Sequence, residues 1–231
     1  MIREKVSHKD HDTQQRVLES ACEIFALKGF KDASITDICE HAQANRAAVN
    51  YYFRDKSQLY EQAWRYAWLQ ASQAYPFDSV VNNSTPAQEV IELFITVVLK
   101  RIFCTGKAGW FPQMMVREMA DPTDAFEGIF QDIIRPQFKL LSQAIQQIVG
   151  PDVAQLNVHL AVMSIVSQCI YFSFNKAVRQ RHFDGNADLA RQIEVLTRHI
   201  IDFSLAGILN IKTGNIKMDN IKLHCQKGGG S

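Results

Sequence analysis

The sequence predicts an all-α protein of nine helices in two domains, a three-helix N-terminal head that contains a helix-turn-helix and a larger C-terminal helical bundle. Three observations support this fold class. Apolar residues recur at spacings of three and four along most of the chain. Capping patterns, glycines and prolines separate these stretches into helix-sized segments. Strand signals are missing, because no sustained alternation of apolar and polar residues is bounded by turns.

The first helix is predicted over residues 13–28, whose apolar residues fall on one face, and Gly29 follows as a stop. Ser34 has Asp37 three residues later. This is the capping-box pattern, in which the hydroxyl and the carboxylate each satisfy a backbone N–H at the start of a helix. We therefore expect a short second helix from Ser34 to His41.

Asn45 can cap a third helix over residues 46–52. A fourth helix is predicted to begin after Asp55, which repeats the capping arrangement with Gln58. Aromatic residues along and after this fourth helix are expected in the core or between the domains: Trp64, Trp68 and Tyr75.

Longer helices are predicted beyond residue 75. Thr85 as a cap and Pro86 in the first turn begin a helix that runs to Phe103, and Asp121 with Pro122 begin another in the same way.

Two breaks divide the C-terminal part of the chain. Gly150–Pro151 separate a helix that ends near Val149 from a long helix over about 152–179. The sequence DGNAD at 184–188 precedes a last helix over about 188–209. The remaining residues are polar and end in GGGS, so we expect a flexible extension or a cloning remnant there.

The composition is that of an ordinary globular protein of 231 residues, with 47% hydrophobic and 21% charged residues. The net charge is +1, and residues 211–231 contribute four lysines against one aspartate to it. Binding to phosphates must therefore come from a local cluster of basic residues and not from the whole surface.

The chain contains no apolar run of eighteen residues. The nearest approach, from His159 to Phe174, includes Ser164, Ser167 and Gln168, which suits a buried helix better than a membrane span. The first residues, MIREKVSHKDHD, lack the apolar core of a signal peptide. We expect a cytoplasmic protein with no membrane partner.

The five cysteines lie far apart and form no CxxC pair. This spacing argues against a disulfide framework and against a zinc site, so we expect no metal and no cofactor. Four of them are interpreted as buried small apolar residues and the fifth as a thiol in the tail: Cys22, Cys39, Cys104, Cys169 and Cys225.

The helices over 34–41 and 46–52, joined by the turn QAN, form the helix-turn-helix arrangement, whose second helix can enter a major groove of DNA. Val49 and Phe53 at spacing four would anchor the second helix against Ile38 and the first helix of the chain. The residues of the second helix that remain outside would then face the nucleic acid.

These outward residue types fit base edges and phosphates. Arg46 can bind guanine in bidentate fashion, Asn50 can pair with adenine or a phosphate, and alanines can touch a thymine methyl group. Hydroxyl and amine donors beside the helix suit the sugar-phosphate backbone. One of the two neighbouring tyrosines is expected to be a packing residue. The predicted DNA-binding residues are Ser34, Thr36, Asn45, Arg46, Ala47, Ala48, Asn50, Tyr51, Tyr52 and Lys56.

The run from Arg16 to Tyr60 resembles the DNA-binding head of TetR-type bacterial transcription regulators. The pattern A..F...G of that family's first helix stands at Ala21, Phe25 and Gly29, and the signature YF..K..L stands at Tyr52, Phe53, Lys56 and Leu59. The resemblance implies a homodimer that reads a palindromic operator with two recognition helices, and a C-terminal domain that binds a small effector. It also favours repression.

The sequence departs from the family pattern at two positions. Gln43 stands where the turn usually has glycine, and Asn50 stands where the recognition helix usually has tyrosine. Further along, the stretch from Met114 to Ile145 is similar to the regulatory domain of the CecR-like subgroup. The predicted domains are 1–60 for DNA binding, 61–210 for ligand binding and dimerisation, and 211–231 as a flexible tail.

The C-terminal bundle contains apolar residues that can line a cavity for a small, largely apolar effector. Most of them can equally be ordinary core residues, and His159 in particular can be a hydrogen-bonded core histidine. The candidate effector-binding residues are Trp110, Met114, Arg117, Glu118, Phe126, His159, Met163 and Tyr171.

The last two predicted helices carry more apolar residues than one buried face requires, so a four-helix bundle with a second copy of the chain is expected. The candidate dimer-interface residues are Val158, Val162, Ile165, Val166, Ile193, Leu196, Ile200 and Phe203.

Together these features predict a ligand-responsive transcription regulator that binds double-stranded DNA as a homodimer. No nucleophile–base pattern, metal-spaced cluster or glycine-rich phosphate loop is found in the sequence, which argues against an enzyme. The alternative is a helical adaptor or small-molecule-binding protein without DNA recognition.

Overall fold

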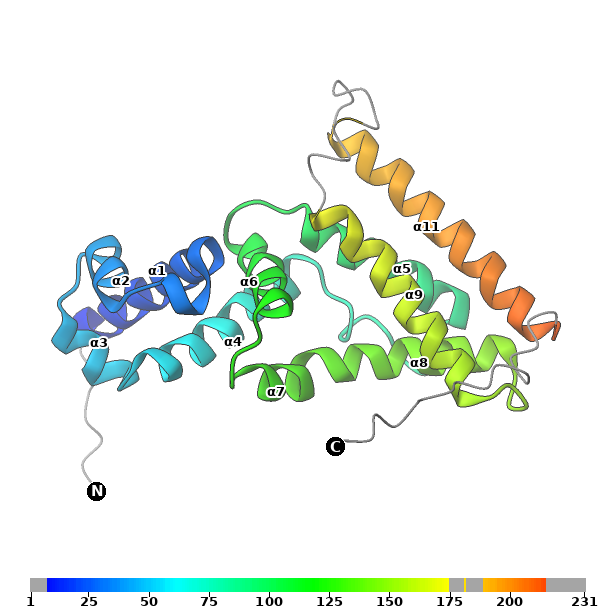
Figure 1. Cartoon of the computed structure of the whole chain (residues 1–231), viewed down its shortest axis with the longest axis horizontal. Coiled ribbons are helices and arrows are strands. Elements are labelled where there is room, and N and C mark those ends of the chain that lie inside the picture. Colours follow the sequence, from blue (N-terminus) through cyan, green and yellow to red (C-terminus); the bar gives the residue numbers. More distant parts are fainter. Residues whose placement is uncertain (1–7, 175–180, 182–188, 215–231) are drawn as a thin grey trace, which may run out of the picture.

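The structure is a computed structural model, which describes residues 8–174, 181 and 189–214. This part of the chain folds into helices and contains no strand, which confirms the predicted all-α class (Figure 1). It holds nine α-helices when Phe126–Val149, a continuous helix with one π-helical turn, is counted once. None of the helices within the described ranges is long and apolar enough to cross a bilayer.

The N-terminal helices are close to those predicted. Their bounds are α1 (His8–Asp32), α2 (Ile35–Ala42), α3 (Arg46–Phe53) and α4 (Lys56–Ala74). Gly29 does not end α1 but interrupts it, with φ 80° and ψ 177°, and one further turn follows. The helix is therefore kinked at the predicted stop.

The three predicted caps of this region are confirmed. The Oγ of Ser34 accepts a hydrogen bond from the backbone N–H of Asp37, while the Asp37 carboxylate accepts one from the Ser34 N–H, both at 3.0 Å. Asn45 caps α3, and Asp55 caps α4 by accepting from the Gln58 N–H at 2.9 Å. The reciprocal bond to the Gln58 side chain is not formed, because the Asp55 N–H donates to the Phe53 carbonyl. Each cap satisfies backbone donors that the first turn of a helix leaves free.

The C-terminal elements begin after residue 86. Their bounds are α5 (Ala87–Ile102), η1 (Gly106–Gly109), α6 (Trp110–Ala120), α7 (Phe126–Ile129), η2 (Phe130–Ile134), α8 (Arg135–Val149), α9 (Gln155–Phe174) and α11 (Leu189–Lys212). In Figure 1, α4 and α6 lie between the N-terminal head and the bundle, and α11 lies along the outer side of α9.

Two predicted helix starts are wrong. Thr85 does not cap α5, because its hydroxyl accepts the Asn82 N–H in the preceding turn, and Pro86 occupies the capping position without a side-chain bond. Asp121 ends α6, and the following helix begins only at Phe126. In both cases a cap-like residue is engaged in the turn before the helix.

Other boundaries shift by a few residues. The helix predicted from 152 begins at Gln155, after a turn. α11 continues to Lys212, so the first residues of the predicted tail are helical. The break predicted at 184–188, the end of the helix predicted to reach 179, and residues 215–231 of the tail lie outside the described residues.

Two hydrophobic cores hold the described helices together. The first is formed by α1 to α4, α6 and the segment around Ile129 and Ile133, and Phe25 and Trp64 are completely buried in it. The second is formed mainly by α5, α8, α9 and α11. The domain boundary proposed after residue 60 falls within α4, and α6 shares the core of the head although it follows α5 in the chain.

The cysteines of the described residues are unpaired. Cys22, Cys39 and Cys169 are buried as expected, and burial raises the pKa of the Cys169 thiol to about 12. Cys104 is only half-buried, because it follows the end of α5, which corrects the expectation of a core residue. Cys225 lies outside the described residues, among which no group of metal-binding side chains is found.

Candidate nucleic-acid interface

α3 has one buried and one exposed face. Val49 and Phe53 are 0% and 1% exposed and belong to the first core together with Ile38, as the sequence predicts. Arg46 and Asn50 lie on the outside. The helix is therefore held by its apolar residues, and Arg46 and Asn50 are exposed to a partner.

The two neighbouring tyrosines have different environments. Tyr51 is 80% exposed, whereas Tyr52 is half-buried and packs against the first core. Their rings meet edge to face, with centroids 5.0 Å apart. The expectation that one of the pair is a packing residue is confirmed for Tyr52. Among the alanines, Ala47 is exposed and Ala48 is half-buried.

The turn between α2 and α3 contains a strained residue. Gln43 has φ 50° and ψ 45°, the left-handed conformation that glycine adopts without penalty. Its N–H donates to the carbonyls of Cys39 and Glu40 and so ends α2. Gln43 therefore adopts the left-handed conformation at the position where the family pattern has glycine.

The capping residues still have hydrogen-bond donors to offer. Ser34 uses the lone pairs of its hydroxyl for the cap, so its O–H remains a donor. Asn45 accepts the Ala48 N–H through Oδ1 at 2.8 Å, which leaves its amide N–H groups free for a ligand. Thr36 is also exposed. The surface beside α3 therefore presents donors, which suit a partner that only accepts hydrogen bonds.

The carboxylate of the capping box, that of Asp37, is paired with a lysine. The ammonium of Lys28 lies 3.0 Å from the Asp37 carboxylate. This hydrogen bond, together with those from Ser34, lowers the pKa of Asp37 to about 2. The carboxylate consequently repels an anionic partner less than an unpaired aspartate would.

Lys56 is directed toward the protein. Its Nζ donates to the backbone carbonyl of Lys31 at 3.3 Å and lies 4.6 Å from the centre of the Phe30 ring. Its pKa is lowered because burial removes water from the ammonium, although Asp32 nearby acts in the opposite direction. Lys56, which the sequence analysis assigned to phosphate contact, therefore connects the start of α4 to the end of α1.

The candidate effector residues are not brought together. Trp110 and Met114 are buried in the first core, whereas Met163 and Tyr171 are more than half exposed on α9. His159 is exposed and hydrogen-bonded to Gln155, which also corrects the alternative of a core histidine; Phe126 is half-buried beside Phe130. These residues do not line one cavity.

Arg117 and Glu118 instead connect α6 to the head. Arg117 donates to the carbonyls of Ala26 and Leu27 near the end of α1. Glu118 is 1% exposed and accepts a hydrogen bond from the Tyr60 hydroxyl at 2.6 Å. Adjacent residues of α6 thus hold both α1 and α4.

The far end of α4 is held by a second buried charge. The Arg101 guanidinium is buried, donates twice to the carbonyl of Tyr75, and lies 4.5 Å from the centre of the Trp68 ring. It also donates to Gln137, whose amide in turn donates to the Ile133 carbonyl in the π-helical turn η2. α4 is therefore attached at both ends to the regions that follow it.

The candidate dimer residues divide between two faces. Val158, Val162, Ile165 and Ile200 are at most 3% exposed and fill the protomer's own core, so they are not available to a partner. Phe203 is 64% exposed. Half-buried residues lie between these extremes: Val166, Ile193 and Leu196.

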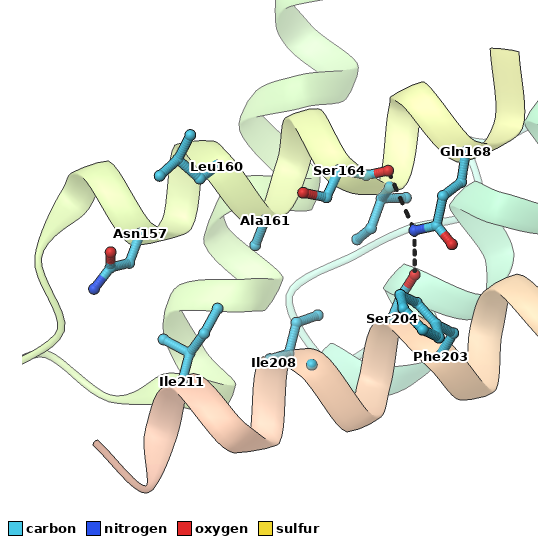
Figure 2. Close-up of a pocket in the computed structure, with 11 residues that line it drawn as sticks. Asn157, Leu160, Ala161, Ser164, Gln168, Phe203, Ser204, Ile208 and Ile211 are labelled. Atoms are coloured by element: carbon cyan, nitrogen blue, oxygen red, sulfur yellow. Dashed lines mark hydrogen bonds between the residues drawn. The ribbon is translucent and has the colours of Figure 1, made fainter. Parts of the chain in front are cut away.

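The exposed side of α9 and α11 mixes large apolar residues with polar and charged ones such as Arg198 and Asp202. It carries large side chains that the sequence analysis did not assign to the interface: Leu156, Leu160, Met163, Val195 and Leu209. Between the two helices runs a groove of about 260 Å³, whose lining includes Gly207. Figure 2 shows Ala161 and Ile208 facing each other across it. At one end of it, the Gln168 amide donates to the Ser164 carbonyl and to Ser204.

Sequence patterns gave no sign of Arg54, Arg101 or the Tyr60–Glu118 contact. Arg101 binds Tyr75 and Gln137, and Tyr60 binds Glu118, across long distances in the sequence, so no local pattern predicts these contacts. Arg54 stands next to the predicted cap Asp55, in a connection of two residues between α3 and α4.

Two family profiles match the chain. Residues 17–63 match the profile described as bacterial regulatory proteins, tetR family. Residues 87–208 match the profile described as the C-terminal domain of the HTH-type transcriptional dual regulator CecR. The second match alone covers more than half of the 231 residues.

Individual relatives agree with these profiles. The chain is similar to the HTH-type transcriptional regulator AcrR of Shigella flexneri, with 30% identity over 60 residues, 26% of this chain and 28% of AcrR. The chain thus spans about a quarter of the length of the curated relatives it matches.

Solved structures extend the likeness to most of the chain. HlyIIR, a hemolysin II transcriptional regulator, gives a TM-score of 0.60 at 20% identity over 84% of this chain and 97% of HlyIIR. FadR of Bacillus subtilis, in complex with stearoyl-CoA, gives 0.61 at 12% identity over 84% of this chain and 98% of FadR. At such identities the likeness shows a shared fold.

Proposed function

The chain belongs to the TetR family of transcription regulators, and from this premise we propose that it binds a palindromic operator as a homodimer and is released by a small, largely apolar effector. Members of this family are DNA-binding, ligand-responsive transcription factors and not enzymes. Repression is the proposed outcome, since binding at an operator blocks access to the DNA. Action on DNA places the protein in the cytoplasm.

The exposed face of α3 carries the DNA-binding proposal. Arg46 and Asn50 are exposed on a helix whose opposite face is completely buried, and donors from the α2 and α3 caps lie beside them. Arginine and asparagine make the bidentate contacts that distinguish guanine and adenine. Donors such as Ser34, Thr36 and Asn45 suit the phosphates that fix the register.

Substitution of Arg46 by alanine tests this assignment. Removal of a single base-reading side chain should weaken binding by about 1–3 kcal/mol and relax the sequence preference at the base pair it reads. The binding site is first selected from random-sequence DNA with the unaltered protein, and both proteins are then titrated on it. A helical adaptor without DNA recognition would select no site, and unchanged binding of the variant would remove Arg46 from the interface.

The homodimer is proposed through the exposed face of α9 and α11. Leu160, Met163 and Phe203 leave large apolar areas exposed in the single chain, and isolated chains rarely expose such contiguous surface. A second copy would cover this face and fill the groove between the helices, forming a four-helix bundle. Two heads held in this way can meet half-sites one turn of DNA apart, about 34–36 Å.

A small, largely apolar effector remains a proposal without an assigned cavity. The solved structure of FadR contains stearoyl-CoA, whose acyl chain is a long apolar group. For this chain we propose a ligand of the same apolar character, because the helices of its second core are rich in apolar residues. Screening of fatty acyl compounds against the complex of protein and selected DNA tests the proposal, and a screen in which none of them releases the DNA contradicts it.

α4 is proposed as the element that transmits the effector signal. It begins beside α3, is held by Glu118 through Tyr60 near one end, and is held by Arg101 at the other. A ligand that binds better to a state with α4 displaced shifts the population toward that state. The two heads would then no longer match successive grooves, and the operator would be released.

A further inference from the structure

The connection between α3 and α4 contains an unusual backbone conformation. Arg54 has φ 66° and ψ −62°, and the N–H of Asp55 donates to the carbonyl of Phe53 at 2.8 Å. These values describe a γ-turn whose central residue has positive φ, the rare and strained form. Glycine adopts positive φ without the clash that a Cβ causes, yet the residue here is arginine.

The fold explains why the turn is tight but not why it holds an arginine. Phe53 must remain in the first core and Asp55 must cap α4, so the chain has to reverse within two residues. Arg54 is exposed, and within the described part of the chain its guanidinium forms no hydrogen bond or ion pair. No hydrogen bond or ion pair of this side chain with the described residues offsets the strain, and strain retained in this way points to a contact made in a bound state.

Among the described residues 11–65, Arg54 is also one of two lysine or arginine side chains without a hydrogen bond or ion pair. Between residues 11 and 65 of the described chain, the other lysines and arginines are bound: Arg16 to Asp12, Lys28 to Asp37, Lys31 to Asp121, Lys56 to the Lys31 carbonyl, and Arg65 to Asp132. The exceptions are Arg46 and Arg54, which stand at the two ends of α3.

The position of Arg54 fits the width of a DNA groove. Its N–H donates to the carbonyl of Asn50 at 3.1 Å, so its backbone still follows the path of α3. Arg46, Asn50 and Arg54 are therefore spaced four residues apart along the chain, and Arg54 is the first residue after α3. At a rise of about 1.5 Å per residue, the two arginines are about 12 Å apart along the axis. The major groove is about 12 Å wide.

We infer that Arg54 is a phosphate-binding residue of the DNA complex, which contacts the backbone at the edge of the groove while the start of α3 reads the bases. The inference rests on the proposed DNA-binding function. Guanidinium groups bind phosphate through two parallel hydrogen bonds, and an unengaged one is available for this contact. In this arrangement Arg54 makes the phosphate contact that the sequence pattern assigns to Lys56. The ammonium of Lys56 is instead hydrogen-bonded to the Lys31 carbonyl at the end of α1.

Three substitutions of Arg54 distinguish the effect of its charge on DNA binding from the effect of its strained backbone. Arg54→Gln removes the charge and keeps the strained side chain, Arg54→Gly removes both, and Arg54→Lys keeps the charge. Binding is measured on the duplex selected by the unaltered protein and on a duplex of scrambled sequence, at several salt concentrations. The matched control is Lys139→Gln, which removes one exposed charge from α8, away from α3.

Removal of a phosphate-binding charge has a characteristic signature. The slope of log K against log salt should become shallower by about 0.9 for each phosphate no longer neutralised. We expect this change for Arg54→Gln and Arg54→Gly on both duplexes, with affinity lowered by a similar factor on each, and an unchanged slope for Arg54→Lys and Lys139→Gln. Thermal unfolding should show a raised midpoint for Arg54→Gly, which excludes misfolding as the cause of weaker binding.

The possible failures are distinguishable. If the unaltered protein selects no DNA, the proposed function fails. If it selects a site and Arg54→Gln binds that site with unchanged affinity and salt slope, the proposed function stands and the role of Arg54 is overturned. A weakening confined to the selected sequence, with no change in slope, would also overturn it, because that pattern belongs to a residue that reads a base.

Discussion

The hydroxyl of Tyr60 donates a 2.6 Å hydrogen bond to the carboxylate of Glu118, which joins α4 to α6 inside the first core. The same carboxylate accepts the N–H and the hydroxyl of Thr123. Burial and the neighbouring carboxylate raise the pKa of Tyr60, so the phenol keeps its proton at physiological pH. Glu118 is therefore satisfied by the Tyr60 hydroxyl of α4 and by two donors of Thr123, in the connection after α6.

Replacement of Tyr60 by phenylalanine should lower the free energy of unfolding. Hydrogen bonds to charged groups contribute about 1.5–3 kcal/mol, and a buried carboxylate that loses one of its donors is left partly unsatisfied. Urea unfolding of the two proteins measures the change. Glu118→Gln, which keeps an acceptor for Tyr60, is expected to lose less stability than Glu118→Ala. Equal midpoints for Tyr60→Phe and the unaltered protein would contradict this account.

Substitution of Gln43 by glycine should stabilise the head. The left-handed conformation at this position costs a residue with a Cβ about 1 kcal/mol relative to glycine. The helix cap made by the backbone N–H is unaffected, because glycine carries the same donor. Chemical unfolding gives the measurement, and Gln43→Ala serves as the control that should bring no gain. A loss of stability in the glycine variant would show that the side chain contributes contacts of its own.

Asp37 should make stability depend on pH in the acidic range. Its folded-state pKa is about 2 because of the hydrogen bonds from Lys28 and Ser34, whereas an unfolded aspartate titrates near about 3.9. A lowered pKa stabilises the fold above the unfolded value, and this contribution is lost as the pH falls toward 2. The thermal midpoint of Asp37→Asn should therefore vary less between about pH 4 and 2 than that of the unaltered protein. Parallel curves would remove Asp37 as the source.

A charge on the exposed face of α11 should separate the proposed dimer. Phe203 is 64% exposed in the single chain, and burial of a glutamate at this site in a dimer would be strongly unfavourable. Sedimentation of Phe203→Glu should give the mass of a monomer, together with weaker binding to a two-half-site operator. Leu69→Glu is the matched control, since Leu69 is 47% exposed on α4. A dimeric Phe203→Glu protein would place the interface elsewhere.

Local patterns predicted the helices well because the residues that decide them are close in sequence. The caps at Ser34, Asn45 and Asp55 each involve a partner three residues away, and all three are confirmed. The cap at Thr85 was wrong although the pattern was the same, because the Asn82 N–H competes for the same hydroxyl. A capping residue therefore predicts a helix start only when the preceding turn leaves it free.

The sequence did not determine which side of a long apolar helix faces the protein's own core. Apolar residues cover both sides of α9, and only the position of the other helices shows that Val158 and Val162 face the protomer's own core while Leu160 and Met163 do not. Lys56 illustrates the same limit, since its partners lie in α1 and are brought to it by the packing of the head.

The sharing of one core by α1, α4 and α6 also bears on how this protein can be recombined with others. Trp110 and Phe111, which follow the end of α3 by more than fifty residues, complete the hydrophobic interior that supports this helix. A chimera joined just after Tyr60 would transfer the exposed residues of α3 without Trp110 and Phe111, which pack in the core beneath them. The N-terminal head is therefore not a unit that can be moved alone. If α3 reads the DNA as proposed, specificity is better exchanged between relatives by changing the exposed residues of α3.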